Sequence, residues 1–113
     1  MPVTRLTAPK ARIDVSLEGV SFTRTGSDAR RRGATRRVHV GWDDVEGADV
    51  LITRKGRVVL LVAVTGAPPV EHHRHDPYAL KVPRGQSDLA HDLVGRINDE
   101  VATRRRWRQT AEG

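Results

Sequence analysis

The 113-residue chain has no cysteine, only four aromatic residues and no long hydrophobic run. The absence of cysteine excludes disulfide bonds, a thiol nucleophile and any zinc site that uses thiolates. The longest apolar run, residues 58 to 64, is about a third of the ~20 residues that a membrane-spanning helix needs. The N-terminal stretch also lacks the apolar segment of a signal peptide. We therefore expect a single cytoplasmic domain with one core of moderate size.

Lysine is scarce as well, with 3 lysines against 17 arginines, and the net charge of +6 is unevenly distributed along the chain. Residues 24 to 37 hold six arginines and one aspartate, and four further arginines lie between Arg104 and Arg108. Such basic segments attract phosphate-bearing partners or anionic membrane surfaces through their long-range field. The alternative is a solvated loop and tail whose arginines contact only water.

Alternation of apolar and polar residues predicts β-strands along most of the chain. Residues 13 to 17, with Leu17 on the apolar face, form a hairpin with residues 20 to 22. Further strands are expected at residues 38 to 42, from residue 50 to 52, at 58 to 64 and at 78 to 82. The segment 58–64 is apolar on both faces, which is typical of a central strand, and Leu61 within it is expected to be a core residue.

The C-terminal part changes from a period of two to the period of a helix. Leu89, Leu93, Ile97 and Val101 recur every four residues and form one apolar stripe. Ser87 or Asp88 precedes the stripe as an N-cap. We therefore expect six or seven antiparallel strands followed by a single amphipathic helix that covers their core.

This order of elements resembles the bacterial members of the pleckstrin-homology (PH-like) superfamily. The resemblance is carried by the hairpins "IDVSLEGVSFTR" and "LITRKGRVVLLVAV", the strand ending "VHVGWDDVEGADV" and the closing "YALKVPRGQSDLAHDLVGRIN". It implies a mainly β (α+β) fold, with a strongly bent antiparallel sheet or barrel capped by the C-terminal helix. On this basis residues 1–10 are a flexible lead-in, 11–104 the PH-like domain and 105–113 a basic C-terminal tail.

The densest arginine run joins two predicted strands, so it is expected to be a loop at the rim of the sheet. In PH-like domains that bind lipid headgroups, basic residues on such loops contact phosphates. The resemblance therefore makes five residues candidates for anion binding: Arg30, Arg31, Arg32, Arg36 and Arg37. Headgroup binders of this family usually carry their basic motif around the first hairpin, where this sequence has the acidic turn "LEGV".

A tryptophan stands inside the second basic run, a combination suited to a membrane interface. The candidate membrane-interface residues are accordingly Arg104, Arg105, Arg106 and Trp107. The competing interpretation is that Trp107 folds back onto the helix or onto a sheet edge, and we favour it because large aromatic side chains are commonly buried.

No pattern in the sequence points to an enzyme. The carboxylates of Asp43 and Asp44 are adjacent, so on a strand they would face opposite sides and would be poorly placed to share a proton or a metal ion. They are instead expected to cap backbone N–H groups of the turn, while Trp42 fills the core. The segment "EHHRHD", residues 71 to 76, has metal-ligand residue types without the helical spacing that brings two ligands together. We predict no catalytic residue, no metal site and no cofactor.

Two classes of function remain. The first is a non-catalytic PH-like binding or adaptor module. Its partner is a protein or peptide in the groove between the C-terminal helix and the neighbouring strand edge, or an anionic membrane surface contacted peripherally by the arginine segments. The alternative is a nucleic-acid-binding protein in which the same arginines attract phosphates without reading sequence. The second class is less favoured because the sequence offers no aromatic platform for base stacking.

Overall fold

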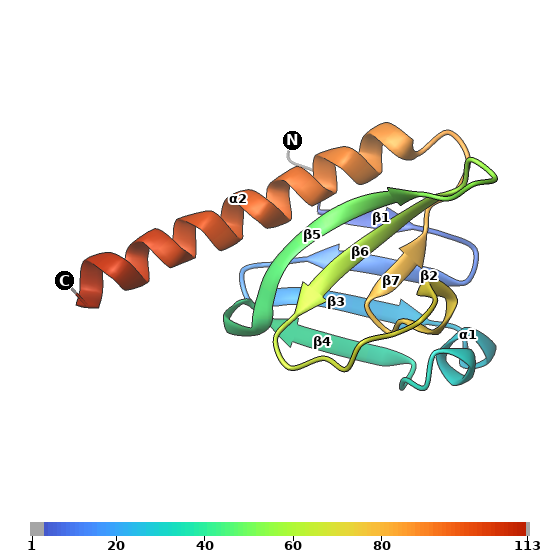
Figure 1. Ribbon diagram of the computed structural model, residues 1–113, viewed down its shortest axis with the longest axis horizontal. Helices are drawn as coiled ribbons and strands as arrows, with labels where there is room; N and C mark the ends of the chain where they lie inside the picture. The colour runs from blue at the N-terminus through green and yellow to red at the C-terminus, as the bar shows by residue number, and fades with distance from the viewer. Residues whose placement is uncertain (1–3, 113) are drawn as a thin grey trace.

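The computed structural model describes residues 4 to 112, which form an α+β fold with two antiparallel sheets and a long C-terminal helix (Figure 1). The first sheet has the order β1-β2-β3-β4. Its strands are β1 (Arg5–Thr7), β2 (Ala11–Val15), β3 (Gly19–Arg24) and β4 (Arg37–Gly41). The second sheet has the order β5-β6-β7. Its strands are β5 (Val45–Ile52), β6 (Val58–Val64) and β7 (Ala79–Lys81).

The strand count and the final helix agree with the prediction, and β6 is the central strand of its sheet as expected. The predicted single bent sheet is instead divided into sheets of four and three strands, and the pairings among residues 4 to 112 do not close a barrel. Two shorter helical elements follow strands of the first sheet: α1 (Gly26–Arg31) joins β3 to β4, and the 3-10 turn η1 (Trp42–Asp44) leads from β4 to β5 of the second sheet. A second 3-10 turn, η2 (His73–His75), precedes β7.

Both ends of the described chain are more regular than the sequence predicts. The expected lead-in contains β1, whose Leu6 is fully buried and pairs with Ile13 of β2. The expected tail continues the last helix, α2, which runs from Ser87 to Glu112. Residues 1–3 and 113, which belong to the same lead-in and tail, lie outside the described residues.

The core lies between the two sheets and under α2. Phe22 and Leu60 contribute fully buried side chains from the two sheets, and Leu93 and Ile97 do so from the helix stripe. Trp42 fills the core as predicted: it is 4% exposed, and its indole Nε1 donates to the carbonyl of Ser16 at 3.0 Å. The apolar stripe read from the sequence is thus the face that α2 buries.

Three local predictions are wrong at the level of single residues. Leu17 lies in the turn between β2 and β3 and is 88% exposed, so it does not extend the apolar face of β2. Leu61 is only half-buried, because Leu60 occupies the face of β6 that points into the core. Asp43 caps no backbone group of its turn and instead accepts a hydrogen bond from Arg108 at 3.0 Å.

Figure 1 shows α2 running along the side of the molecule formed by β1 and β5, with its last turns extending beyond the strands. The helix packs most heavily on β5 and touches β1 and β6 as well. No helix within residues 4 to 112 combines the length and apolar character needed to cross a membrane.

Candidate anion-binding surface

The arginine run predicted to be a loop begins as the short helix α1. Thr25 is its N-cap, with Oγ1 accepting from the backbone N of Asp28 at 3.4 Å. An acidic residue in the first turn and arginines in the last turn suit the helix dipole. Gly33, with a positive φ of 64°, follows the helix end. These capping residues were visible in the sequence, but a helix of six residues has no apolar period to reveal it.

The carboxylate of Asp28 joins three arginines beneath this helix. Its Oδ2 lies 2.7 Å from Arg24 Nη1 and 3.2 Å from Arg32 Nε, while its Oδ1 lies 2.5 Å from Arg31 Nη2. Arg24, Asp28 and Arg32 are all less than a tenth exposed. Burial alone would raise the pKa of Asp28, but the hydrogen bond from Arg24 and the charges of Arg32 and Arg24 lower it below its usual value. The carboxylate is therefore ionised at neutral pH.

The same buried arginines fasten α1 to the segment that leads into β7. Arg32 Nη1 donates to the carbonyls of His73 and Asp76 at 2.6 and 2.9 Å. Arg24 Nη2 donates to the carbonyls of Pro77 and Ala79 at 2.9 and 2.5 Å. Arg32, predicted as an anion ligand, thus points inward and is satisfied inside the protein, which removes it from any surface site.

The other four arginines of the predicted anion site are exposed. Arg31 forms an ion pair with Asp28, whereas Arg30, Arg36 and Arg37 form no ion pair among the described residues. The guanidinium of Arg36 lies over Gly26, where a Cβ atom would come within 2.8 Å of it. Glycine at this position therefore allows Arg36 to cross the first turn of α1.

A second set of cations, missed in the sequence, surrounds Lys81. The pKa of the Lys81 amine is lowered by partial desolvation and then by the positive charges of Arg57, Lys10, Arg31 and Arg74. All five side chains are exposed, and only Arg31 forms an ion pair within residues 4–112. We call these residues the basic cluster.

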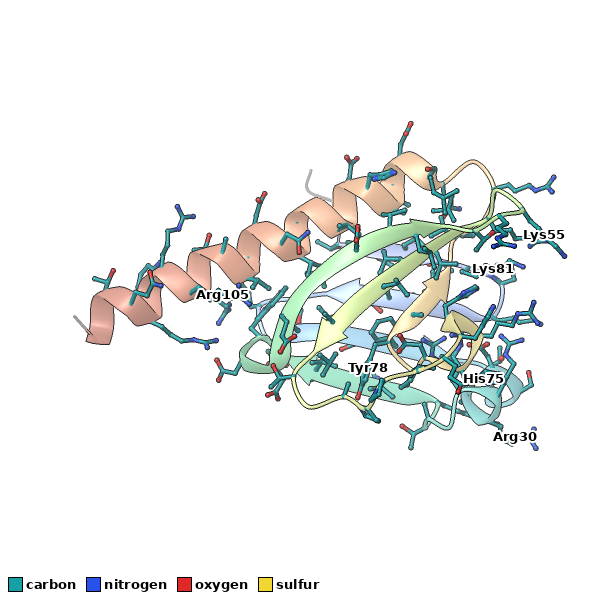
Figure 2. The ribbon with its side chains drawn as sticks, in the orientation of Figure 1. Arg30, Lys55, His75, Tyr78, Lys81 and Arg105 are labelled. Atoms are coloured by element: carbon teal, nitrogen blue, oxygen red, sulfur yellow. The ribbon has the colours of Figure 1, made fainter. Side chains whose placement is uncertain are left out.

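The basic cluster collects one residue from each of five separate segments. They are the β1–β2 turn, α1, the residue before β6, η2 and β7. In Figure 2, Lys81, Lys55, His75 and Arg30 lie at one end of the molecule, and Arg105 lies on the helix toward the other end. The fold therefore brings exposed cations from separate segments together at the end opposite the C-terminus.

Hydrogen bonds between loops hold these segments together. The backbone N of Thr25 donates to the carbonyl of Lys10 at 2.9 Å, which joins the β1–β2 turn to α1. His75 Nδ1 lies 3.2 Å from the carbonyl of Arg31, which joins η2 to α1. The first hairpin of the structure is β1–β2, and its turn carries Lys10. The acidic turn "LEGV", predicted to belong to the first hairpin, joins β2 to β3.

The arginines near the C-terminus fasten the last turns of α2 to the body. Arg104 donates to the carbonyl of Leu17 at 3.1 Å, and within α2 it also pairs with Glu100, one turn earlier, at 2.8 Å. Arg105 donates to the carbonyl of Glu46 at 3.3 Å. These contacts are at the surface, where each contributes at most about 1 kcal/mol.

The remaining members of the predicted membrane interface point outward. Trp107 is 75% exposed, so the favoured interpretation that it folds back onto the protein is wrong. A shallow hollow beside it is lined by Thr103, Arg106, Trp107 and Thr110, all on α2. Because one helix supplies every lining residue, the hollow is an open surface with no opposing wall.

The predicted peptide groove between α2 and β5 is occupied by side chains of the protein itself. Asn98 accepts from the backbone N of Ala48 at 2.8 Å and donates to the carbonyl of Ala48 at 3.0 Å. The backbone N of Val50 is bound by Asp49 Oδ1 at 2.8 Å. A strand that entered this groove would have to displace Asn98 from the edge of β5.

The histidines of residues 71 to 76 lie beside the basic cluster. Among residues 4 to 112 no three His, Cys, Asp or Glu side chains are placed to share a metal ion. The rings of His72 and His73 stack with their centroids 4.2 Å apart. Partial burial, followed by the charges of His72, Arg32 and Arg74, lowers the pKa of His73.

We expect His73 to make the protein less stable in mild acid. Because the pKa of His73 is lower in the folded state, the unfolded chain binds a proton at this histidine first as the pH falls below ~6.5. The free energy of unfolding therefore decreases as the pH falls. The decrease in melting temperature between about pH 7.5 and 5.5 should be smaller for His73→Asn than for the wild type. An equal decrease in both proteins would show that His73 does not titrate as its surroundings indicate.

Searches of protein-family models, of curated proteins and of solved structures find no match to this chain. Its function is therefore inferred from its own charges, contacts and exposed surfaces.

Proposed function

We propose that this chain is a non-catalytic PH-like module that binds anionic, phosphate-bearing membrane surfaces through the basic cluster. Sheets of four and three antiparallel strands followed by one helix support the PH-like assignment. The observation that carries the binding function is that four exposed cations, from four other segments of the chain, gather around the exposed Lys81 of β7. Arg30 and Arg36 add further exposed charge from α1 and the segment after it.

Clustered like charges destabilise the unbound protein, and an anionic surface relieves that repulsion. Each cation near such a surface contributes about 1 kcal/mol, so the basic cluster supplies on the order of 5 kcal/mol. That free energy corresponds to a dissociation constant on the order of 0.1 mM. Binding through this cluster alone is therefore weak and salt-sensitive, and stable attachment requires a second contact.

Nucleic acid is the competing ligand because its phosphates offer the same charge. Tight binding of single strands also uses exposed aromatic side chains on which bases stack. Near the basic cluster, Tyr78 is half-buried, and its ring packs edge-on against Phe22 with centroids 6.4 Å apart. This packing favours a membrane surface over a polynucleotide.

Liposome co-sedimentation tests the proposal with charge-matched variants. We expect the wild type to pellet with vesicles containing phosphatidylserine and not with phosphatidylcholine vesicles. The variant Lys10→Gln/Arg57→Gln/Lys81→Gln should lose most of this binding, with the apparent affinity falling at least about 100-fold for three lost charges. The wild-type binding should also weaken steeply as salt is raised.

The control variant Arg105→Gln/Arg106→Gln/Arg108→Gln removes the same charge from the helix end and should retain most of the binding. Equal loss in both variants would mean that only net charge matters, and loss in the control alone would move the membrane site to the surface around Trp107. Tighter binding of a DNA oligonucleotide than of anionic vesicles at the same salt would favour the competing function. Each of these results would contradict the proposal.

A further inference from the structure

The strand β4 leaves one backbone edge of the first sheet open. Of the strands described, it pairs with β3 alone. The register of this pairing continues to Arg36, whose carbonyl accepts from the backbone N of Arg24 at 2.7 Å. Since backbone groups alternate in direction along a strand, Arg37, His39 and Gly41 direct their N–H and C=O groups away from β3. Among the described residues, the one hydrogen bond to these groups is from Thr35 Oγ1 to the carbonyl of Arg37, at 2.7 Å.

The other sheet edges are covered by the protein itself. Asn98 binds both backbone groups of Ala48 on β5, and Arg24 binds the carbonyl of Ala79 on β7. The third edge, β1, is three residues long and is contacted by α2. Open edges are usually blunted because they pair with other chains. β4 has five residues, no proline and no bulge, so its open edge is suited to pairing.

We propose that β4 pairs antiparallel with β4 of a second copy of this chain, around a two-fold axis at His39. The charge pattern of the strand is complementary to itself in this arrangement. Arg36 and Arg37 stand at its start, and Asp43 and Asp44 follow its end. An antiparallel partner brings the basic start of each strand to the acidic end of the other.

His39 is the middle residue of the strand Arg37–Gly41, so an axis there uses the whole strand. The outward backbone groups of His39 then bond to those of the second His39, and those of Arg37 to Gly41. The same register sets Val38 opposite Val40. Val38 is half-buried on its own, and this pair would extend the apolar core across the axis.

Space and charge at the two ends support the same register. Gly41 has no side chain, so the guanidinium of Arg37 can extend across it toward the acidic end of the opposite strand. The side chain of Asp43 is 90% exposed, and among residues 4 to 112 its one partner is Arg108, whose own side chain is half exposed. The dimer would carry two basic clusters, which would strengthen attachment to one surface, but its formation does not depend on membrane binding.

Sedimentation velocity of the full chain over a range of concentrations tests the pairing. A five-residue edge buries a small area, so we expect a monomer–dimer equilibrium at micromolar to millimolar concentration. Arg36→Glu/Arg37→Glu should weaken the dimer at least about tenfold because like charges would meet at both ends, and Asp43→Arg/Asp44→Arg should do the same. Combining all four substitutions restores opposite charges and should restore the dimer. Arg108→Gln, which removes only the contact to Asp43, should leave the dimer intact.

Because the chain has no cysteine, a single introduced cysteine gives a second and independent readout. His39→Cys places a thiol on the axis in each copy, and mild oxidation should produce a covalent dimer. Ser21→Cys lies directly across from His39 on β3. Its two copies would be separated by about 15 Å, from strand spacings of ~4.8 Å, so it should not cross-link.

Three outcomes would overturn the inference. The first is a monomer at all concentrations together with no cross-linking of His39→Cys. The second is a dimer that persists in Arg36→Glu/Arg37→Glu. The third is a dimer that the four combined substitutions fail to restore. A folded monomer is recognised by an unchanged circular dichroism spectrum, so loss of the dimer is separated from loss of the fold.

Discussion

Replacing Asp28 with alanine is expected to lower the free energy of unfolding by about 3–5 kcal/mol, because it leaves buried arginines without their counter-ion. Arg24 and Arg32 are 4% and 7% exposed and both contact this carboxylate. The loss is a large part of the 5–15 kcal/mol that stabilises a typical domain. Urea denaturation at neutral pH measures it directly.

Asp14→Ala is the matched control, because Asp14 also pairs with two arginines but lies at the surface. It accepts from Arg5 at 2.5 Å and from Arg12 at 2.9 Å, and its side chain is 25% exposed. We expect it to cost about 1 kcal/mol or less. Similar losses of stability for Asp14→Ala and Asp28→Ala would mean that the buried ion pairs of Asp28 are not what fastens α1.

The buried ion pairs of Asp28 should also contribute to acid unfolding. The pKa of Asp28 is lowered in the folded protein despite burial, through the hydrogen bond and charges of Arg24 and Arg32. Its contribution is therefore complete above the unfolded pKa of ~3.9 and is lost as the pH falls through the lower folded value. Arg24→Met/Asp28→Leu/Arg32→Met, which replaces the whole cluster with apolar residues, should be less damaging than Asp28→Ala alone.

Leu60→Ala is expected to destabilise the protein by about 2–5 kcal/mol, since it removes a fully buried side chain and leaves a cavity. Leu60 lies on the face of β6 that joins the core between the two sheets. The measurement is again the urea midpoint, at an unchanged denaturant slope.

Leu61→Ala is the matched control on the neighbouring residue. Leu61 lies on the outer face of β6, is half-buried and stands opposite Ala79 of β7. We expect a loss of about 1 kcal/mol or less. A larger loss for Leu61→Ala than for Leu60→Ala would mean that the register of β6 is shifted by one residue, because such a shift exchanges the two faces.

These two leucines show how far the sequence could predict the fold. The run 58–64 is apolar throughout, so its composition identified the central strand but not the face directed into the core. That choice depends on pairing with β5 and β7, which are distant in sequence from each other. The sequence signal was strong for Trp42 and for the stripe of α2, because there only one face is apolar.

The sequence failed to predict two short elements, β1 and α1, for the same reason. β1 contains a single apolar residue, Leu6, and becomes a strand only through pairing with β2. α1 has a single buried apolar residue, Ala29, and is fastened by Asp28, one of whose arginine partners, Arg24, lies in β3. Each element depends on contacts with other segments, and its local pattern is too short to indicate a period.

By itself, the sequence determined the set of central strands, the C-terminal helix and the two arginine-rich segments, because alternation, helical period and charge are local properties of the chain. The tertiary structure alone decided what those charges do. It buried Arg32 against Asp28 and brought Lys10, far along the chain, into the charged surroundings of Lys81. The physical reason is that ion pairs and charge clusters depend on distance in space, which folding sets through strand register and loop contacts.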